Sequence, residues 1–360
     1  MNISDRYIAK TLFSFTATVL IVWMGVYGFF NFLEEMSSVG KASYSSLHAM
    51  RYIILQMPDV IYNHSTSIIL LGCVLGMGHL ATSNQLIVMR ISGISIFKIT
   101  MFTIKIALIF VFLFIILGEV IAPFSSEEAE RGRSRALELS TVSKNEEGFW
   151  IKDGSSFINV KKNIDGEIFD NISIFEINPL NFIDNITTAE RAIFDGKSLE
   201  MINTQLYSID ESIIIDNISY KEMNSLNKFV SFDKDLINSL KKTPQDLTTW
   251  KIIKQINYLS DNKLRADIFE VELYKRLARP LTLIAMILVA MLFIFGSNRS
   301  ETLGRKIFFG IALGLSFEMI SRIGGAFSLG FEINPIISAI VPSFAVMLIA
   351  LVILTLKSSK

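Results

Sequence analysis

Six long apolar stretches decide what this chain can fold into. A helix needs about 20 consecutive apolar residues to cross the hydrocarbon core of a bilayer. Six stretches approach or exceed that length with at most two charged residues each, and they cover 11–33, 60–81, 99–122, 280–297, 307–331 and 333–356. Charged residues make up only 19% of the 360-residue chain, whereas soluble domains have about 25%. We therefore predict a polytopic α-helical membrane protein with six transmembrane helices.

The distribution of lysine and arginine predicts the orientation of these spans, because cytoplasmic loops are enriched in both residues. The short loops on one side offer Lys41 and Arg51, whereas the other side has Arg6, Lys10, Arg90, Lys98, Arg299, Arg305, Lys306, Lys357 and Lys360. Both termini are thus expected in the cytoplasm of a bacterium, with the long third loop outside the inner membrane, in the periplasm of a Gram-negative cell. Three cations oppose this rule, but they flank a long translocated segment, where the bias is weaker: Lys275, Arg276 and Arg279.

Residues 123–278 form the predicted external domain, between membrane segments 1–122 and 279–360. Three Asp-Gly pairs indicate tight turns, because glycine supplies the positive φ that short hairpins need, and they lie at 153–154, 165–166 and 195–196. Short β-rich runs occur at 149–151, 157–160, 172–177 and 212–220. Short strands at close spacing are typical of an antiparallel sheet in a sandwich or jelly roll.

Two helical segments are expected beside this sheet. One continues outward from the third span over 131–139. The other covers 246–259 after Thr243-Pro244, and its periodicity predicts one apolar stripe made of Leu247, Trp250, Ile253 and Ile256. The external domain is thus predicted as β structure with flanking helices.

The overall charge and the motifs argue against several activities. The 34 basic and 34 acidic residues cancel, so nothing favours nucleic-acid binding. Gly196-Lys197-Ser198 is similar to the end of a phosphate-binding loop, but Arg191 stands where that motif requires glycine. The histidines are too far apart in sequence for metal-ligand spacing: His48, His64 and His79. We predict no catalytic residue, no metal and no cofactor bound by this chain.

Asp59 and His64, near the start of the second span, leave one enzymatic alternative open. A carboxylate and an imidazole could form the acid–base pair of an intramembrane enzyme. Polar positions that line a helix bundle are the commoner arrangement. A scaffold or binding protein, whose external domain gathers partners without moving lipid, is a further alternative.

Four short motifs resemble those of one membrane-protein family. They are DRYIAK at 5–10, LIVMRISG at 86–93, EVIAP at 119–123 and YKRLARP at 274–280. In this order and spacing, with three spans on each side of an external domain, they are similar to the lipopolysaccharide export permeases of the LptF/LptG (YjgP/YjgQ) family. The resemblance covers essentially the whole chain, and the first motif is more similar to the LptG branch than to the LptF branch.

The resemblance implies a β-jellyroll external domain and a permease subunit of an ABC transporter. It implies a heterodimer with an LptF-like sister permease above a dimeric LptB-like ATPase, which uses ATP and Mg. An LptC-like bitopic protein and an LptA-like periplasmic bridge are further expected partners. The complex would extract lipopolysaccharide from the outer leaflet of the inner membrane and pass it toward the outer membrane. The sister permease itself, and a permease for another amphiphile, stay alternatives.

The cytoplasmic loop at about 82–95 resembles a coupling helix that docks on the ATPase. A short amphipathic helix would pack Leu86, Met89 and Ile91 into a groove of the partner, and Gly93 would allow the turn back into the membrane. The family commonly has an acidic residue where this chain has Gln85, which argues against a salt bridge there. A plain connector is the alternative. The expected coupling residues are Gln85, Leu86, Val88, Met89, Arg90 and Gly93.

Arg131, Arg133 and Arg135, just beyond the third span, are candidates for binding the phosphates of lipid A. Guanidinium groups bind phosphate in bidentate fashion, and Arg133 matches a basic lipopolysaccharide contact of the family. The alternative is a solvated run balanced by neighbouring glutamates. Lys41 is a candidate substitute for lysines that family members present at the end of span one, where this chain has Asn31, Ser37 and Ser38.

Glu318 and Arg322 are charged residues within the fifth span, one helical turn apart on a shared face. Isolated charges at this depth are costly, so mutual pairing or a wet cavity must compensate. They either join two permeases or line a cavity, whose lateral gates in the family use spans one and five. Trp23, Tyr27 and Phe317 on those spans would suit acyl chains, and would equally suit lipid-facing packing.

Overall fold

The chain divides into two compact units. The computed structural model describes residues 3–137, 148–164, 167–180, 182–210, 217–240, 242–296, 303–331 and 333–358. A helical unit comprises Met1–Gly40, Tyr44–Arg131 and Asp267–Lys360, and a β unit comprises Lys41–Ser43 and Gly132–Ala266. The β unit is thus inserted within the sequence of the helical unit. Several residues used in the predictions lie outside the described residues: Leu139, Asp165, Gly166, 212–216, Arg299 and Lys360.

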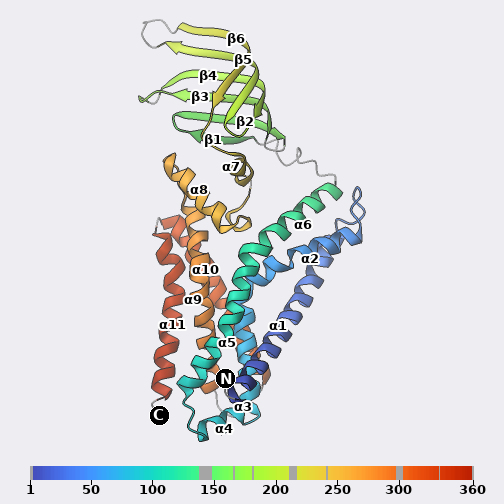
Figure 1. Ribbon diagram of the computed structural model, residues 1–360, viewed down its shortest axis with the longest axis vertical. Coiled ribbons are helices and arrows are strands. Elements are labelled where there is room, and N and C mark those ends of the chain that lie inside the picture. Colours follow the sequence, from blue (N-terminus) through green and yellow to red (C-terminus); the bar gives the residue numbers. More distant parts are fainter. Residues whose placement is uncertain are drawn as a thin grey trace. The chain divides into compact units, whose positions relative to one another are not determined.

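Six helices of the described chain are long and apolar enough to cross a membrane, as the sequence predicts. They are α1 (Ile3–Met36), α3 (Ser65–Thr82), α5 (Ile96–Ile116), α9 (Asp267–Gly296), α10 (Leu303–Phe331) and α11 (Pro335–Ser358). Figure 1 places the N- and C-termini at the same end of the helical unit, as an even number of crossings requires.

The helical unit also has shorter elements around the second and third spans. α2 (Ser46–Asn63) precedes α3 and is not among the predicted helices, because it is too polar for a span. α4 (Gln85–Ile91) lies between α3 and α5. After α5, the helix continues through a π-helical turn, η1 (Leu117–Ile121), into α6 (Ala122–Ala136). The predicted outward continuation of the third span is therefore present as far as Ala136.

α3 lies at the centre of the helical unit. Of its most apolar window 72% is buried, compared with 17% for α1 and α11, and α3 packs against α1, α9 and α10. A glycine allows the closest of these approaches, because a Cβ at Gly72 would lie 2.4 Å from Thr16 Oγ1 of α1. The outer faces of α1, α10 and α11 are left to face lipid or another protein.

The β unit contains one sheet of six antiparallel strands in chain order. They are β1 (Phe149–Asp153), β2 (Ser156–Ile164), β3 (Ile168–Ile177), β4 (Ile183–Phe194), β5 (Ser198–Asp210) and β6 (Asn217–Phe229). Gly154 (φ +59°) and Gly196 (φ +100°) make two of the predicted turns. The fold class of six spans with an inserted antiparallel β domain is confirmed. The described strands form a single sheet, whereas a sandwich has two.

Helices, rather than a second sheet, cover the apolar face of these strands. Ile158 and Ile174 of the sheet are buried in one core with Phe232 and with Ile237 of α7 (Lys234–Ser239). A further helix, α8 (Thr249–Asp261), is tied to the edge strand β1. The Tyr258 hydroxyl accepts a hydrogen bond from the Lys152 N–H (3.1 Å) and donates one to the Lys152 carbonyl (2.9 Å).

The predicted apolar stripe is correct for Leu247, which is buried, and wrong for Trp250, while Ile253 and Ile256 are half-buried. A 3₁₀ turn, η2 (Pro244–Asp246), follows the proline, and α8 begins only after Thr248, whose Oγ1 accepts a hydrogen bond from the Lys251 N–H. The buried face of α8 is centred on Ile252 and Gln255, whereas Trp250 is 75% exposed. The shift arises because the proline starts a separate turn instead of the helix itself.

Candidate functional site

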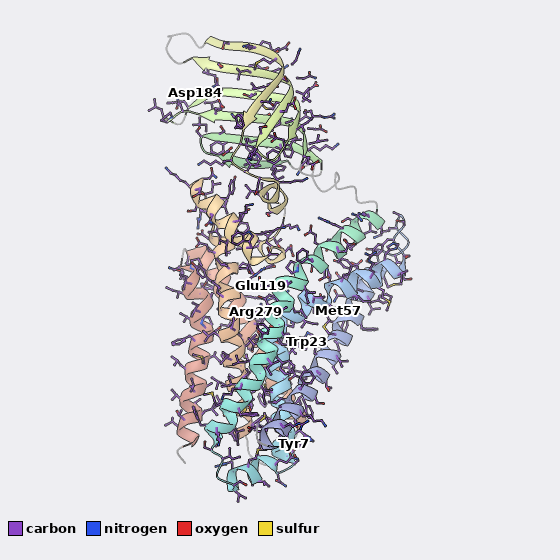
Figure 2. The ribbon with its side chains drawn as sticks, viewed as in Figure 1. Tyr7, Trp23, Met57, Glu119, Asp184 and Arg279 are labelled. Carbon is purple, nitrogen blue, oxygen red and sulfur yellow. The ribbon has the colours of Figure 1, made fainter. Side chains whose placement is uncertain are left out.

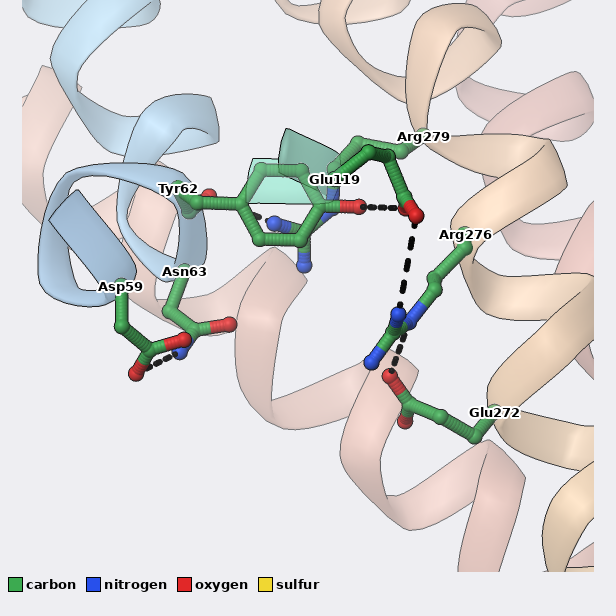
Figure 3. Close-up of polar contacts among 7 residues, drawn as sticks. All are labelled: Asp59, Tyr62, Asn63, Glu119, Glu272, Arg276 and Arg279. Carbon is green, nitrogen blue, oxygen red and sulfur yellow. Dashed lines mark hydrogen bonds and ion pairs between the residues drawn. The ribbon is translucent and has the colours of Figure 1, made fainter. Parts of the chain in front are cut away.

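A polar cluster joins α2 to the third and fourth spans of the helical unit (Figure 3). Tyr62 lies near the end of α2, where the last carbonyl groups of a helix lack helical partners. Arg279 of α9 donates a hydrogen bond from Nη1 to the Tyr62 carbonyl oxygen (2.5 Å). Its guanidinium carbon also lies 4.0 Å from the centre of the Tyr62 ring, a cation–π contact. One arginine thus fixes both the backbone and the ring of Tyr62.

Glu119 connects this tyrosine to a second arginine. It accepts a hydrogen bond from the Tyr62 hydroxyl (3.4 Å) and pairs with Arg276 Nη1 (3.8 Å). Arg276 Nε also donates to Glu272 Oε1 at 3.1 Å, and only 7% of the arginine side chain is exposed. Charges in a membrane-spanning bundle are stabilised by such mutual pairing. The network therefore holds α2, the third span and α9 together.

The π-helical turn η1 shapes the place of Glu119. At the preceding residue, Gly118, an added Cβ would lie 2.1 Å from Tyr62 Cδ2, so only glycine leaves room for the ring. Insertions of this kind inside α-helices occur frequently at functional positions. Figure 2 shows Glu119 and Arg279 toward one end of the helical unit, with Tyr7 toward the other.

A second polar group lies next to the first, around His64. This residue separates α2 from α3, and its Nδ1 lies 3.9 Å from Glu318 Oε2 of α10. Glu318 Oε1 accepts a hydrogen bond from Arg322 Nη2 at 2.8 Å. The Glu318 side chain is 22% exposed, whereas that of Arg322 is 73% exposed. The pair predicted on the fifth span is therefore formed, with its arginine on the outside of the single chain.

Two of the three predicted aromatic residues flank the same histidine. The ring centres of Trp23 and Tyr27 on α1 lie 5.3 Å and 6.3 Å from that of His64. Phe317 is 8% exposed and packs in the core of the helical unit. Asp59, which the enzymatic alternative pairs with His64, accepts a hydrogen bond from Asn63 (2.9 Å). Side chains of the first and fifth spans thus both lie next to His64, which directly precedes the second span.

The loop between the second and third spans forms the predicted short helix, α4, but with a different orientation. Leu86 and Met89 are buried in the core of this chain, so the expectation that they fill a groove of a partner is wrong. Val88 (62% exposed) and Ile91 (82% exposed) form the outer apolar face. The reason is that α4 packs against α3 of its own unit.

The two ends of α4 hold it in this orientation. Gln85 Nε2 donates a hydrogen bond to the Tyr7 hydroxyl of α1 (3.0 Å), so it acts within the chain. Arg90 is exposed. Gly93 has φ +85° and makes the predicted turn toward α5. Ser95 then caps α5 by accepting a hydrogen bond from the Lys98 N–H.

The predicted cations beyond the third span are in different environments. Arg131 is exposed and pairs with Glu127 one turn earlier. Arg133 is half-buried, and Arg135 is exposed near the end of α6. Lys41 is exposed in the short loop after α1. Ser43, two residues on, donates hydrogen bonds from its N–H and Oγ to the Ala136 carbonyl oxygen (3.0 and 2.9 Å).

Comparison with known proteins supplies the deciding observation. The family model described as "Lipopolysaccharide export system permease LptF/LptG" matches residues 6–356. The chain belongs to the LptF/LptG family. It is 28% identical over 359 residues to the "Lipopolysaccharide export system permease protein LptG" of Escherichia coli strain K12, covering 99% of both chains. The protein of the same name from Haemophilus influenzae strain Rd is 28% identical over 347 residues, 95% of both chains.

Membership of the LptF/LptG family accounts for the whole chain, since the match runs through both halves of the helical unit and through the β unit. The chain is a multi-pass protein of the bacterial inner membrane. Among the described residues, no group of three His, Cys, Asp or Glu side chains could hold a metal ion.

The sequence predictions missed the cluster around Tyr62. They treat Arg276 and Arg279 as exceptions to the charge rule, whereas both arginines have partners inside the bundle. A signal was present, because Glu272 and Arg276 are one helical turn apart and so can pair. The contribution of Glu119 could not be found in this way, since it comes from a different span.

Proposed function

We propose that this chain is a permease subunit of an ABC transporter that exports lipopolysaccharide, on the LptG side of a heterodimer with an LptF-like permease. The names of both relatives support the LptG side. In this proposal a dimeric LptB-like ATPase hydrolyses ATP with Mg in the cytoplasm, where both termini lie. An LptC-like bitopic protein and an LptA-like bridge meet the β unit in the periplasm. The complex extracts lipopolysaccharide from the outer leaflet and passes it outward.

One observation carries this proposal: the pair Glu318–Arg322 on a membrane-spanning helix, with the Arg322 side chain 73% exposed. An exposed arginine at this position would be costly against lipid tails. The face of α10 that carries it must therefore meet another protein or a polar substrate. A cavity between two permeases, filled by a lipid with phosphate groups, satisfies both requirements.

The residues around His64 form one wall of the proposed cavity. Arg322 can bind a lipid phosphate in bidentate fashion, while Glu318 holds the guanidinium in place from one side. Trp23 and Tyr27 next to His64 present aromatic surface to acyl chains. Phe317 supports this wall from the core behind it.

Cations at the end of α6 are the proposed first contact for the phosphates of lipid A. The Ser43–Ala136 hydrogen bonds join the loop after α1 to the end of α6. Lys41 lies two residues before Ser43, and Arg135 lies directly before Ala136. Arg133 lies on the preceding half-turn, and Arg131 is held by Glu127. Two or more cations in such an arrangement favour a ligand with several negative charges.

The outer face of α4 is the proposed contact with the ATPase. Val88, Arg90 and Ile91 are exposed there, and apolar residues on a short helix fit a groove of a soluble partner. The orientation of this helix is set within the chain. Its buried side has Leu86 and Met89, Gln85 bonds to Tyr7, and Gly93 makes the turn after it. Ile91→Asp should therefore weaken co-purification of the ATPase, whereas Leu47→Asp, at an exposed residue of α2, should not.

Release of lipopolysaccharide from proteoliposomes that contain the assembled complex tests the proposal. Arg322→Ala should slow ATP-driven release by about tenfold or more, because a charge-assisted contact contributes roughly 1.5–3 kcal/mol. Arg191→Ala, which removes an exposed arginine of the β unit, is the matched control. Unchanged release in Arg322→Ala would contradict the cavity. In cells, depletion of the chain should leave new lipopolysaccharide in the inner membrane, and normal export would contradict the function.

A further inference from the structure

A polar groove of about 540 Å³ crosses the middle of the β unit, on strands β2 to β6. No predicted contact uses it. Its lining is dominated by neutral side chains that can both donate and accept hydrogen bonds, among them Asn171, Ser173, Thr188, Asn203, Gln205 and Asn224. A groove of this size is large enough for a ligand of two or three sugar rings.

A line of irregular pairing creates the groove. Ala189 pairs with Thr204 and Arg191 with Ile202 in the same register, but Glu190 and Asn203, which face each other between them, are not paired. The neighbouring strands show the same gap at Asn171. Asn171 (φ +54°) and Asn203 (φ +55°) adopt the left-handed conformation, which asparagine tolerates better than most residues. Asn171 and Asn203 lie on one line of unpaired positions that runs across the strands through the groove.

Hydrogen bonds within the groove hold its polar groups in place. Asn203 Nδ2 donates to Glu190 Oε2 at 2.8 Å. The Tyr207 hydroxyl donates to Gln205 Oε1 at 3.2 Å. The lining is not basic, because it has one lysine, Lys161, against two glutamates. This charge balance disfavours a phosphate and favours an uncharged ligand rich in hydroxyl groups.

Aromatic rings lie beside the polar groove on the same face of the sheet. Ser173, Thr188 and Gln205 are paired across β3, β4 and β5, and the next paired row on that face, two residues along, contains Phe175 and Tyr207. Trp150 stacks on Phe175 with ring centres 5.7 Å apart, and Tyr207 lies 5.2 Å from Tyr220. Trp150 (58%) and Tyr220 (51%) are exposed.

We propose that this groove binds the sugar portion of a glycolipid. Amide and hydroxyl side chains exchange hydrogen bonds with sugar hydroxyl groups, which are donors and acceptors at once. The exposed aromatic rings pack against the apolar C–H faces of the sugar rings. The inference rests on the proposed export of a glycolipid and adds a contact for its saccharide part.

Binding of a lipid-free oligosaccharide tests the groove directly. The probe is the core oligosaccharide released from lipopolysaccharide by mild acid, titrated into the full chain in its complex and followed by saturation-transfer NMR. Asn203→Gly with Gln205→Met removes two amides, while glycine keeps the left-handed backbone and methionine keeps the side-chain length. Binding should weaken by about thirtyfold, as expected for two lost hydrogen bonds of about 1 kcal/mol each. Asn227→Ala, at an exposed position of β6 outside the groove, should bind as the unmodified chain does.

Two outcomes would overturn the inference. Absence of oligosaccharide binding to the unmodified complex is one, and equal binding by the double variant and the unmodified chain is the other. Lipid A without core sugars serves as competitor, and displacement of the oligosaccharide from the groove by lipid A would also count against a sugar site. Failure of lipopolysaccharide release in the unmodified complex would instead contradict the proposed function, so the two failures are distinguishable.

Discussion

Charged side chains are used in opposite ways by the two units of this protein. In the helical unit, Arg276 is 7% exposed and lies between Glu119 and Glu272. In the β unit, Arg191 pairs with Asp170 at 3.0 Å, yet 56% of its side chain is exposed. Breaking a buried pair leaves a charge without solvation, whereas an exposed pair contributes little because water screens it. The comparison teaches that burial decides what an ion pair contributes: the Arg276 pairs are a structural necessity, whereas the Arg191–Asp170 pair is near-neutral.

Removal of Arg276 should have the largest effect on stability. Arg276→Met leaves two carboxylates without their shared cation, and we expect a loss of about 3–5 kcal/mol. Chemical unfolding of the purified chain in detergent would measure it. Arg191→Met is the matched control in the β unit. Equal losses of unfolding free energy in the two variants would contradict the difference between the buried and the exposed pair. Adding Glu119→Gln and Glu272→Gln to Arg276→Met should restore stability, because the unpaired charges are then removed.

Close packing around Tyr62 should give the next largest effect. Gly118→Ala places a Cβ 2.1 Å from the Tyr62 ring, and overpacking of this kind costs about 1–3 kcal/mol. Gly132→Ala is the matched control, because no atom lies within 4 Å of a Cβ built there. Thermal unfolding in detergent should show a lower midpoint only for Gly118→Ala. A similar midpoint for both variants would mean that the helices adjust freely around the ring.

The β unit should be less stable in acid than at neutral pH. Burial tends to raise the pKa of Glu176, but hydrogen bonds from Lys228 and Asn185 outweigh it and lower that pKa overall. Burial likewise opposes the lowering of the Asp233 pKa by Lys254 and by the Leu236 N–H. A lowered folded-state pKa gives stability that is present above the unfolded value and is lost as pH falls below it. The ordinary values are 4.5 and 3.8.

Hydrogen exchange of β-unit peptides at about pH 7, 5, 4 and 3 would follow this change. Protection around β3 and α7 should fall mainly in the last two steps, and Glu176→Gln should reduce the acid dependence. Glu200→Gln, at an exposed residue of β5, is the control. Protection that decreases as pH rises would contradict the sign of this prediction.

The exposed pair of the β unit should give the smallest effect. A double-mutant cycle on Arg191 and Asp170 should yield a coupling energy of about 0.2–1 kcal/mol. Unfolding of the four variants at low and high salt would measure it, with the smaller value at high salt. A coupling as large as the effect of Arg276→Met would remove the distinction between the two units.

The architecture could be predicted because it depends on sums over many residues. Each span is a long run of apolar side chains, and the number and length of these runs survive any detail of packing. The turns at Gly154 and Gly196 were likewise predictable, because the requirement for positive φ is local. The start of α8 was not, since Pro244 opens a separate turn and the helix is capped instead by Thr248.

The candidate site could be predicted only in part. Glu318 and Arg322 were found because their four-residue spacing within one helix is sufficient to pair them. The pairing of Glu119 with Arg276 depends on how two distant segments pack, which spacing does not encode. The inward orientation of Leu86 and Met89 has the same cause. A short apolar pattern shows that one face will be covered, but not whether the covering surface belongs to the chain or to a partner.

Site-specific photo-crosslinking to lipopolysaccharide tests the central claim most directly. A photoreactive residue at Arg322, on the exposed edge of the polar group, should crosslink to the lipid, and ATP turnover in the complex should reduce the crosslink as the lipid leaves. The same residue at Ile349 of α11, which is 60% exposed, should give little crosslink. Equal crosslinking at both positions, or none at Arg322, would contradict the account that this face of α10 lines the path of the exported lipid.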